Sequence, residues 1–264
     1  MKLGFIGCGN MASAMIKGIL DKKLLDREHL IVSDLSEESC RRARESFGIE
    51  AVQDNLRVVE ECRCIVLAVK PQYYQQVIRQ IRDQVTGSHL IVTIAPGKTI
   101  HWLEECFVKD VKLVRTMPNT PAQAGAGMTG ICANENVTEE ELRMVSRIFE
   151  SFGKAEVVPE SMMDAVVSVS GSSPAFVFMF IEALADAAVA DGMPRKMAYE
   201  FAAQAVYGSA KLMLETGMHP GELKDMVCSP GGTTIAAVQV LEEKGLRSSI
   251  IEASRACAAK SRQM

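Results

Sequence analysis

The sequence contains no run of basic residues, no low-complexity segment and no short repeat. Its 264 residues carry 29 Lys and Arg against 33 Asp and Glu, so the formal net charge is −4. Without a basic patch the chain has no electrostatic attraction for a polyanion, which excludes nucleic acid as a partner. A hydrophobic content of 48% is ordinary for a soluble globular protein. The length suits two modest domains or one large one.

Patterns that bind metal ions are also missing. The four histidines are scattered, with no H-x-x-H or H-E-x-x-H spacing. Cys62 and Cys64 form a C-x-C, but no second Cys or His pair accompanies them, so we expect no metal site. Eight cysteines without a secretory signal predict free thiols in the reducing cytoplasm.

Membrane-spanning segments are not expected either. The first apolar stretch is broken at once by Gly7–Asn10, which is untypical of a signal peptide. The longest apolar helix, Ala175–Val189, is interrupted by Glu182 and Asp186. We therefore expect no membrane span.

What the sequence does contain is a dinucleotide motif at its amino end. The apolar run Lys2–Ile6 suits a buried strand, and the apolar spacing after Ser13 predicts a helix. Between them, Gly7–Ala12 reads G-x-G-x-x-A, the fingerprint of a Rossmann-type βα turn. Gly7 permits the tight turn, Gly9 lets a pyrophosphate approach the backbone, and Ala12 lets the helix pack against the strand. The context predicts a bound dinucleotide.

A carboxylate follows the second predicted strand, Leu30–Ser33. Asp34 stands about 20 residues after the motif, where such folds place the residue that faces the adenosine ribose. A carboxylate there accepts hydrogen bonds from a 2′-OH and repels a 2′-phosphate, which favours NADH. The alternative is that Asp34 only shapes the turn before the helix that begins near Ser36.

Alternating strand and helix signals continue to about residue 159. The apolar run Cys64–Val69 is typical of a central parallel strand. Lys70 ends it, at the edge where a doubly wound sheet binds its ligand, so we expect Lys70 to face the cofactor. Further strands are predicted over His89–Ile94 and Val111–Arg115. The pattern predicts an α/β domain with a doubly wound parallel sheet over residues 1–159.

The carboxyl half, residues 160–264, is predicted to be all helical. Its helices are expected over Ala175–Asp191, Arg195–Glu215, Thr233–Glu243 and Arg247–Ser261. The first of them is apolar almost all round and must be buried on most faces. A domain of about 100 residues is too small to enclose it, so we expect a homodimer through these helices.

A second anion site is indicated near the carboxyl end, where Cys228–Gly232 leads into a helix that begins at Thr233. A Ser-Pro-Gly-Gly turn, two hydroxyl residues and the positive end of a helix dipole converge on one point. Such a point holds a small carboxylate or phosphate. The alternative is an ordinary helix cap with glycines for tight packing.

Five segments, in order, resemble one family. They are Gly7–Ala12, Ala68–Pro71, Arg115–Pro121, Ser170–Phe176 and Val227–Glu242. Together they are similar to pyrroline-5-carboxylate reductase, the last enzyme of proline biosynthesis, and the resemblance covers essentially the whole chain. It implies NAD(P)H-dependent reduction of the cyclic imine 1-pyrroline-5-carboxylate to L-proline. It also implies a helical dimerisation domain and often a larger ring of dimers.

The resemblance carries residue roles onto this sequence. The cofactor-binding set it implies is Gly7, Cys8, Gly9, Asn10, Met11, Ser33, Asp34, Asn55, Ala68, Val69, Lys70 and Pro71. The implied substrate-binding set is Ser229, Gly231, Gly232, Thr233 and Thr234. Thr234 would lie closest to the ring nitrogen and is the candidate catalytic residue. The family commonly uses NADPH, whereas Asp34 stands where a small polar residue often receives the 2′-phosphate.

The chemistry agrees with these residues. A bound cyclic imine is largely protonated beside its own carboxylate, and an iminium carbon accepts hydride directly. Positioning and electrostatics then matter more than a strong acid. Two alternatives stay open. A related imine or hydroxyacid reductase would show a Lys or Asp catalyst in the helix Ala175–Asp191. A non-catalytic NAD(P)-binding regulatory paralogue is disfavoured by the intact glycine–threonine turn.

Overall fold

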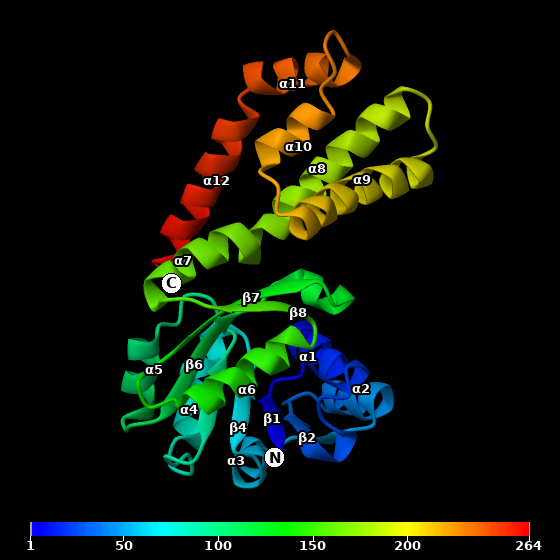
Figure 1. Cartoon of the computed structure of the whole chain (residues 1–264). Coiled ribbons are helices and arrows are strands. Elements are labelled where there is room, and N and C mark those ends of the chain that lie inside the picture. Colours follow the sequence, from blue (N-terminus) through cyan, green and yellow to red (C-terminus); the bar gives the residue numbers. More distant parts are fainter. Residues whose placement is uncertain (1, 264) are drawn as a thin grey trace. The chain divides into compact units, whose positions relative to one another are not determined.

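The computed structural model describes residues 2–263 and divides the chain into two compact units (Figure 1). The first unit runs to Ser172 and includes the segment from Cys257 onward. The second unit is Ser173–Ala256.

An eight-stranded sheet forms the centre of the first unit, in the order β3-β2-β1-β4-β5-β6-β7-β8. The strands are β1 Leu3–Ile6, β2 Leu30–Ser33, β3 Glu50–Val52, β4 Cys64–Leu67, β5 Leu90–Thr93, β6 Lys112–Met117, β7 Gly127–Ala133 and β8 Gly153–Val157. In this order β1 is paired with both β2 and β4, with Leu3 opposite Leu30 on one side and Cys64 on the other. The doubly wound α/β fold predicted from the sequence is confirmed.

One strand pair departs from the predicted parallel arrangement. β6 and β7 run antiparallel, with Val114 opposite Ala133, whereas the other pairings of the described sheet are parallel. Their connection contains only the short 3₁₀ helix η3, Thr120–Ala124. A parallel return needs a crossover of a dozen or more residues, so this short connection reverses the chain direction.

Helices cover both faces of the sheet (Figure 1). They are α1 Asn10–Asp21, α2 Glu37–Phe47, α3 Asn55–Glu61, α4 Tyr74–Ile81, α5 Ile100–Phe107 and α6 Glu139–Glu150, with the short 3₁₀ helices η1 Arg27–His29, η2 Pro71–Tyr73 and η4 Glu160–Met162. α1, α2 and α6 share one buried cluster with Leu3 and Phe5, whereas α3, α4 and α5 share the other with Ile6. Successive strand residues therefore enter opposite cores, as the period of two requires.

The first unit ends in an irregular helix. α7, Met163–Val166, runs into a π-helical turn, η5, over Val167–Ser172. Ser261, near the end of α12 (Leu246–Ser261), donates its hydroxyl to Asp164 Oδ1 at 2.7 Å. This hydrogen bond joins the end of α12 to α7.

The second unit is helical, as predicted. It contains α8 Ser173–Ala190, α9 Arg195–Thr216, α10 Pro220–Met226, α11 Thr233–Glu243 and most of α12. The bounds of α11 agree with the prediction. α10 was not predicted, because Pro220 and Gly221 are typical turn residues. Pro220 instead occupies the first helical position, and His219 Nδ1 accepts the Gly221 N–H at 3.1 Å.

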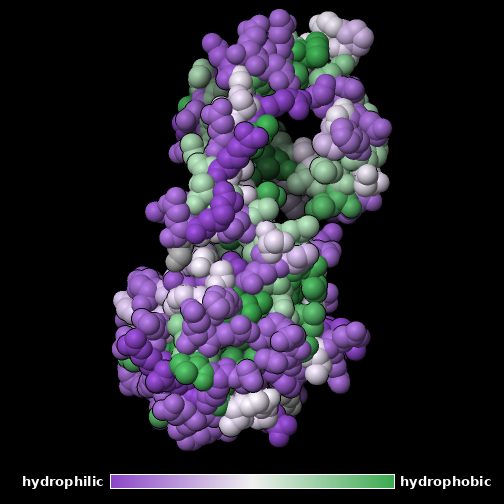
Figure 2. All heavy atoms as spheres, turned by 90° about the vertical axis from the view of Figure 1, so that its left-hand side faces the viewer, coloured by the Kyte–Doolittle hydropathy of each residue, from purple (hydrophilic) through white to green (hydrophobic). Residues whose placement is uncertain are grey.

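The expectation that the apolar helix is buried on most faces fails within a single chain. Of α8, only Ala185 is buried, whereas Phe178 and Met179 are 63% and 68% exposed. Figure 2 shows hydrophobic side chains, in green, reaching the surface among these helices. Within residues 2–263, one helical stretch, Glu160–Ala190, is long and apolar enough to cross a membrane by composition alone. A core helix of a soluble protein meets the same criterion. In the single chain this stretch therefore presents an apolar surface that no other part of the described chain covers.

Candidate active site

The sheet order places a ligand crevice between β1 and β4. From β1 the chain winds toward β2 and β3, and from β4 it winds the other way toward β5 and β6. The loops after β1 and β4 therefore separate at the carboxyl edge of the sheet, which is where doubly wound folds bind nucleotides. The predicted residues Gly7–Met11 and Ala68–Pro71 are these two loops.

The turn after β1 has the shape that a pyrophosphate requires. Gly7 has φ +101°, and a Cβ there would lie 2.7 Å from the Ala68 carbonyl oxygen. At Gly9 a Cβ would meet nothing within 4 Å, so the space outside this residue is open. α1 begins at Asn10 without a side-chain cap. The first-turn N–H groups and the helix dipole thus face an open cradle suited to a phosphate.

Asp34 is engaged in shaping this cradle. Its Oδ2 accepts the Cys8 backbone N–H at 2.8 Å, and its Oδ1 accepts the Ser36 N–H at 2.9 Å. Asp34 therefore does shape the turn before α2, which is the alternative that the sequence left open. It also binds the glycine motif through the Cys8 N–H. Burial raises the pKa of the neighbouring Cys8 thiol, so that side chain stays neutral.

Ser33 and Asn55 lie together where β2 ends and α3 begins. Both are buried, and Ser33 Oγ donates to Asn55 Oδ1 at 2.7 Å. Asn55 Nδ2 in turn donates to Gln80 Oε1 at 2.9 Å. The network ties the end of β2 to the start of α3 and to α4.

The loop after β4 lies on the other side of the crevice. The Ala68 N–H donates to the Ile6 carbonyl at 2.8 Å, which joins this loop to the end of β1. Lys70 is exposed where β4 gives way to η2, and Pro71 occupies the first position of that 3₁₀ helix. An exposed lysine at this edge can pair with a negatively charged ligand.

The glycine–threonine turn in the second unit also begins an uncapped helix. The Gly232 N–H donates to the Ser229 carbonyl at 3.0 Å, and Gly231 has φ +69°, as Pro-Gly turns require. A Cβ on Gly232 would lie 2.5 Å from Ser229 Oγ, so a larger residue there would require the serine side chain to rotate away. α11 starts at Thr233 with no side-chain cap, and Thr234 is half-buried in its first turn. The free N–H groups make an anion site here too.

The sequence assigned no role to Asn119, which the structure places at a junction. Buried Asn119 accepts the Met128 N–H on Oδ1 at 2.8 Å and donates from Nδ2 to the Ser170 carbonyl at 3.0 Å. A Cβ on Gly171 would lie 2.6 Å from Met117 Cε. Asn119 thus binds the π-helical turn to the carboxyl edge of the sheet. The only sequence signal was its place in the segment Arg115–Pro121.

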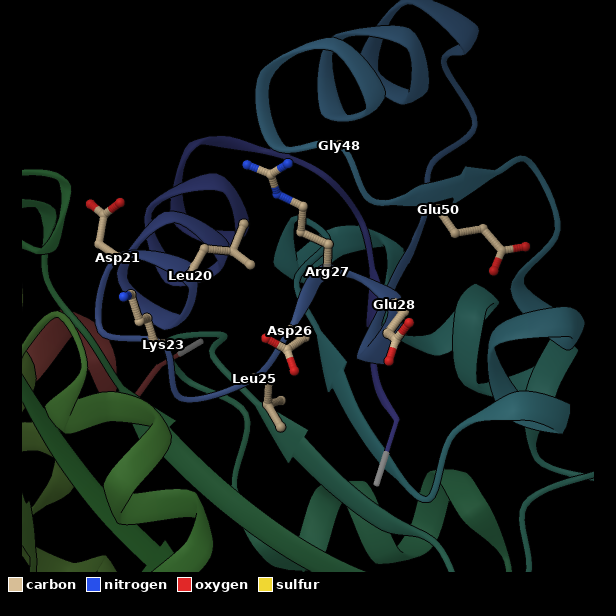
Figure 3. A pocket seen from close by; sticks show the side chains of 9 residues that line it. All are labelled: Leu20, Asp21, Lys23, Leu25, Asp26, Arg27, Glu28, Gly48 and Glu50. Carbon is tan, nitrogen blue, oxygen red and sulfur yellow. The ribbon is translucent and has the colours of Figure 1, made fainter.

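One cavity lies outside this site. It measures about 820 Å³ and lies at the amino ends of β2 and β3, the edge opposite the crevice (Figure 3). It is lined by Leu20, Asp21, Lys23, Leu25, Asp26, Arg27, Glu28, Gly48 and Glu50. Charges of both signs share its wall, so it selects no ion. Within residues 2–263 no group of His, Cys, Asp and Glu could hold a metal.

A Rossmann sheet with a phosphate cradle, followed by helices with an unpaired apolar surface, defines an NAD(P)-binding oxidoreductase with a helical assembly domain. Residues 2–97 match the family model described as NADP oxidoreductase, coenzyme F420-dependent. Residues 160–264 match the model described as pyrroline-5-carboxylate reductase dimerisation.

Whole-chain relatives identify the family. The chain is 50% identical over 263 residues to pyrroline-5-carboxylate reductase of Escherichia coli, covering 100% of this chain and 98% of the relative. Identity to the same enzyme of Methanosarcina acetivorans is 43%, covering 96% and 93%. The reductase structure from Plasmodium falciparum with NADP bound superimposes with a TM-score of 0.91 at 32% identity, covering 100% and 97%. This chain belongs to the pyrroline-5-carboxylate reductase family.

Proposed function

We propose that this protein reduces 1-pyrroline-5-carboxylate to L-proline with NAD(P)H, the last step of proline biosynthesis. The observation that carries the proposal is the uncapped start of α11 behind the Ser229–Gly232 turn. That turn is shaped for a small carboxylate, and it occurs in a chain that also has a dinucleotide cradle at Gly7–Met11.

In the proposed function each half of the chain binds a different ligand. Residues 1–159 hold the cofactor, and residues 160–264, the span of the dimerisation match, hold the substrate and the partner subunit. The cofactor residues are Gly7, Cys8, Gly9, Asn10, Met11, Ser33, Asp34, Asn55, Ala68, Val69, Lys70 and Pro71. The substrate residues are Ser229, Gly231, Gly232, Thr233 and Thr234. Cysteines kept as thiols by burial suit a cytoplasmic enzyme.

The residues present are suited to orienting an iminium ion. The α11 N-terminus binds the substrate carboxylate, which fixes the ring relative to the helix axis. Thr234 in the first turn then hydrogen-bonds the ring nitrogen and sets which ring face is open. When bound, the nicotinamide supplies a hydride to the carbon of the C=N bond. Because the nitrogen is already protonated, reduction yields the neutral ring amine, and no strong acid is required.

The first test is turnover. Purified protein given 1-pyrroline-5-carboxylate and either NADPH or NADH should oxidise the cofactor and form proline in equal amounts, followed by absorbance at 340 nm and amino-acid analysis. A related reductase would turn over other imines or hydroxyacids but not this one. A regulatory paralogue would bind cofactor without substrate-dependent oxidation, and either result would refute the proposal.

Substitution of Thr234 tests its role at the ring nitrogen. Thr234→Ala should lower kcat/KM for the imine by roughly 10–100-fold, since a hydrogen bond to a charged group is worth about 1.5–3 kcal/mol. Thr234→Ser keeps the hydroxyl and should retain most activity. Folding of both variants should match the wild type, measured by circular dichroism. An unchanged kcat/KM for Thr234→Ala would assign the residue to the helix end alone.

We further propose that the exposed apolar side chains of α8 and α9 are covered by a second copy of the chain rather than by lipid. Phe178, Met179 and Phe201 are each more than 60% exposed in the single chain, and the dimerisation match includes them. An unpaired patch of this kind marks an interface. A ring of such dimers is a compatible larger assembly.

Light scattering at low micromolar concentration checks this assembly. We expect twice the 28.8 kDa chain mass or a multiple of it, without detergent. Phe178→Lys with Phe201→Lys places charges in the apolar surface and should dissociate or aggregate the protein. A monodisperse wild-type monomer would contradict the interface.

Cofactor preference is proposed to lean toward NADH. Two N–H donors hold Asp34 in place at the adenosine end, so its charge stays near the 2′ position. Of the two helix arginines that could compensate, Arg41 pairs with Glu45 at 3.9 Å. Burial raises the pKa of the Cys8 thiol and the Arg42 charge opposes that rise, so Arg42 lies near the glycine motif and is the arginine that could compensate. Repulsion of a 2′-phosphate, screened by solvent, amounts to about 1–3 kcal/mol.

Steady-state kinetics with both cofactors test this preference. kcat/KM for NADH should at least equal that for NADPH, and Asp34→Ser should shift the ratio toward NADPH. Arg44→Ala is the control, since Arg44 contacts Glu37 and the Ala51 carbonyl rather than Asp34, and the ratio should stay the same. A strong wild-type preference for NADPH would show that α2 compensates for the Asp34 charge.

A further inference from the structure

Tyr74 is a buried tyrosine at the carboxyl edge of the sheet that no step of the proposed reaction uses. It is the first residue of α4 and is fully buried. Its hydroxyl donates to the carbonyl oxygen of Leu67, the last residue of β4. Burial raises the pKa of Tyr74, so the phenol keeps its proton and donates at any working pH.

The same hydroxyl oxygen also accepts from the neighbouring strand. Thr93, the last residue of β5, donates from Oγ1 at 2.9 Å, and the Ile94 N–H lies at 3.4 Å. One oxygen atom thus joins the ends of β4 and β5 at the points where both strands turn into loops.

Further hydrogen bonds at Thr93 reach β6 and the loop after β5. Thr116 Oγ1 donates to the Thr93 carbonyl at 2.8 Å, and the Ala95 N–H donates to Thr93 Oγ1 at 3.3 Å. All of these atoms belong to the first unit. Side-chain networks of this kind rigidify the backbone when every member is satisfied.

These strand ends lie on one side of the crevice only. On the other side of the crevice, Asp34 accepts the Cys8 and Ser36 N–H groups, and Ser33 bonds Asn55, which in turn bonds Gln80 of α4. We assign this side to the adenosine half of the cofactor. By elimination, the nicotinamide end of a bound dinucleotide lies over the loops after β4 and β5. The Tyr74 hydroxyl holds the ends of β4 and β5 and makes no hydrogen bond to Asp34, Ser33 or Asn55.

We propose that Tyr74 is a positioning residue for the nicotinamide half of the cofactor, an inference that rests on the proposed cofactor site. Its hydroxyl fixes the loop Ala68–Pro71 relative to the start of the loop after β5. Loss of that oxygen leaves the Leu67 carbonyl without its donor and lets the two loops separate, while the adenosine side keeps its own hydrogen bonds.

Paired ligands separate positioning from general stability. NADP⁺ and 2′-phospho-ADP-ribose differ only by nicotinamide, as do NAD⁺ and ADP-ribose. In Tyr74→Phe we expect the Kd of the complete dinucleotide to rise about tenfold, which corresponds to ~1.4 kcal/mol, while the Kd of the ADP-ribose partner stays within about twofold. Titration calorimetry on the wild type first identifies which dinucleotide, NADP⁺ or NAD⁺, binds more tightly. The Kd of that dinucleotide and of its ADP-ribose partner is then measured for each variant. No imine substrate is needed.

Tyr73→Phe is the matched control, because Tyr73 is the adjacent residue, is 50% exposed and loses the same atom. Both Kd values should be unchanged in it. Thr93→Val, which removes the donor to the Tyr74 oxygen, should weaken the dinucleotide in the same direction, and Thr93→Ser should restore it. The two Thr93 variants test the same hydrogen bond if Tyr74→Phe folds poorly.

The outcomes are distinct. Equal weakening of both ligands in Tyr74→Phe would make the residue merely structural and overturn the inference, as would no change in either. Wild-type protein that binds neither dinucleotide would overturn the proposed cofactor site together with this inference. Wild-type binding with unchanged variants would overturn the inference alone and leave the proposed function standing.

Discussion

The cofactor half of this protein depends on the absence of one side chain, at Gly7. A Cβ there would lie 2.7 Å from the Ala68 carbonyl oxygen and 3.0 Å from Val69 Cγ1, and the residue has φ +101°. Only glycine lets the loop after β1 turn this sharply against the loop after β4. The two loops therefore lie against each other at Gly7, whereas the space outside Gly9 remains open. Phosphate groups can reach the first turn of α1 through that space.

The two predicted anion sites follow the same physical plan. α1 begins after Gly9 and α11 begins after Gly232, and neither helix has a side-chain cap. In contrast, α2 and α5 are capped by Ser36 and Thr99, each of which accepts a backbone N–H. Where the first N–H groups of a helix have no acceptor within the protein, those groups and the helix dipole favour a bound anion. Both predicted sites therefore offer an anion backbone N–H groups and a helix dipole rather than a cluster of cationic side chains.

Local signals in the sequence were enough for β1, β2 and α11, because each depends on apolar runs or turn residues that are contiguous. β7 and β8 were missed, since glycines interrupt Gly127–Ala133 and charged residues interrupt Gly153–Val157. The hydrogen bond from Cys8 to Asp34 joins positions far apart in the chain, so only the folded sheet reveals it. Helical periodicity likewise does not distinguish the π turn at Val167–Ser172 from ordinary α-helix.

The second unit has little hydrophobic core of its own. The stability of the predicted anion site in this unit therefore depends on contacts beyond that core. The fully buried residues of its apolar cluster are three alanines, Ala185, Ala198 and Ala202. Alanines bury little apolar area, while phenylalanines and methionines of α8 and α9 stay exposed. Most of the hydrophobic stabilisation available to this unit is therefore realised only when another surface covers those side chains. Since the Ser229–Gly232 turn belongs to the same unit, assembly and formation of the proposed substrate site depend on the same source of stability.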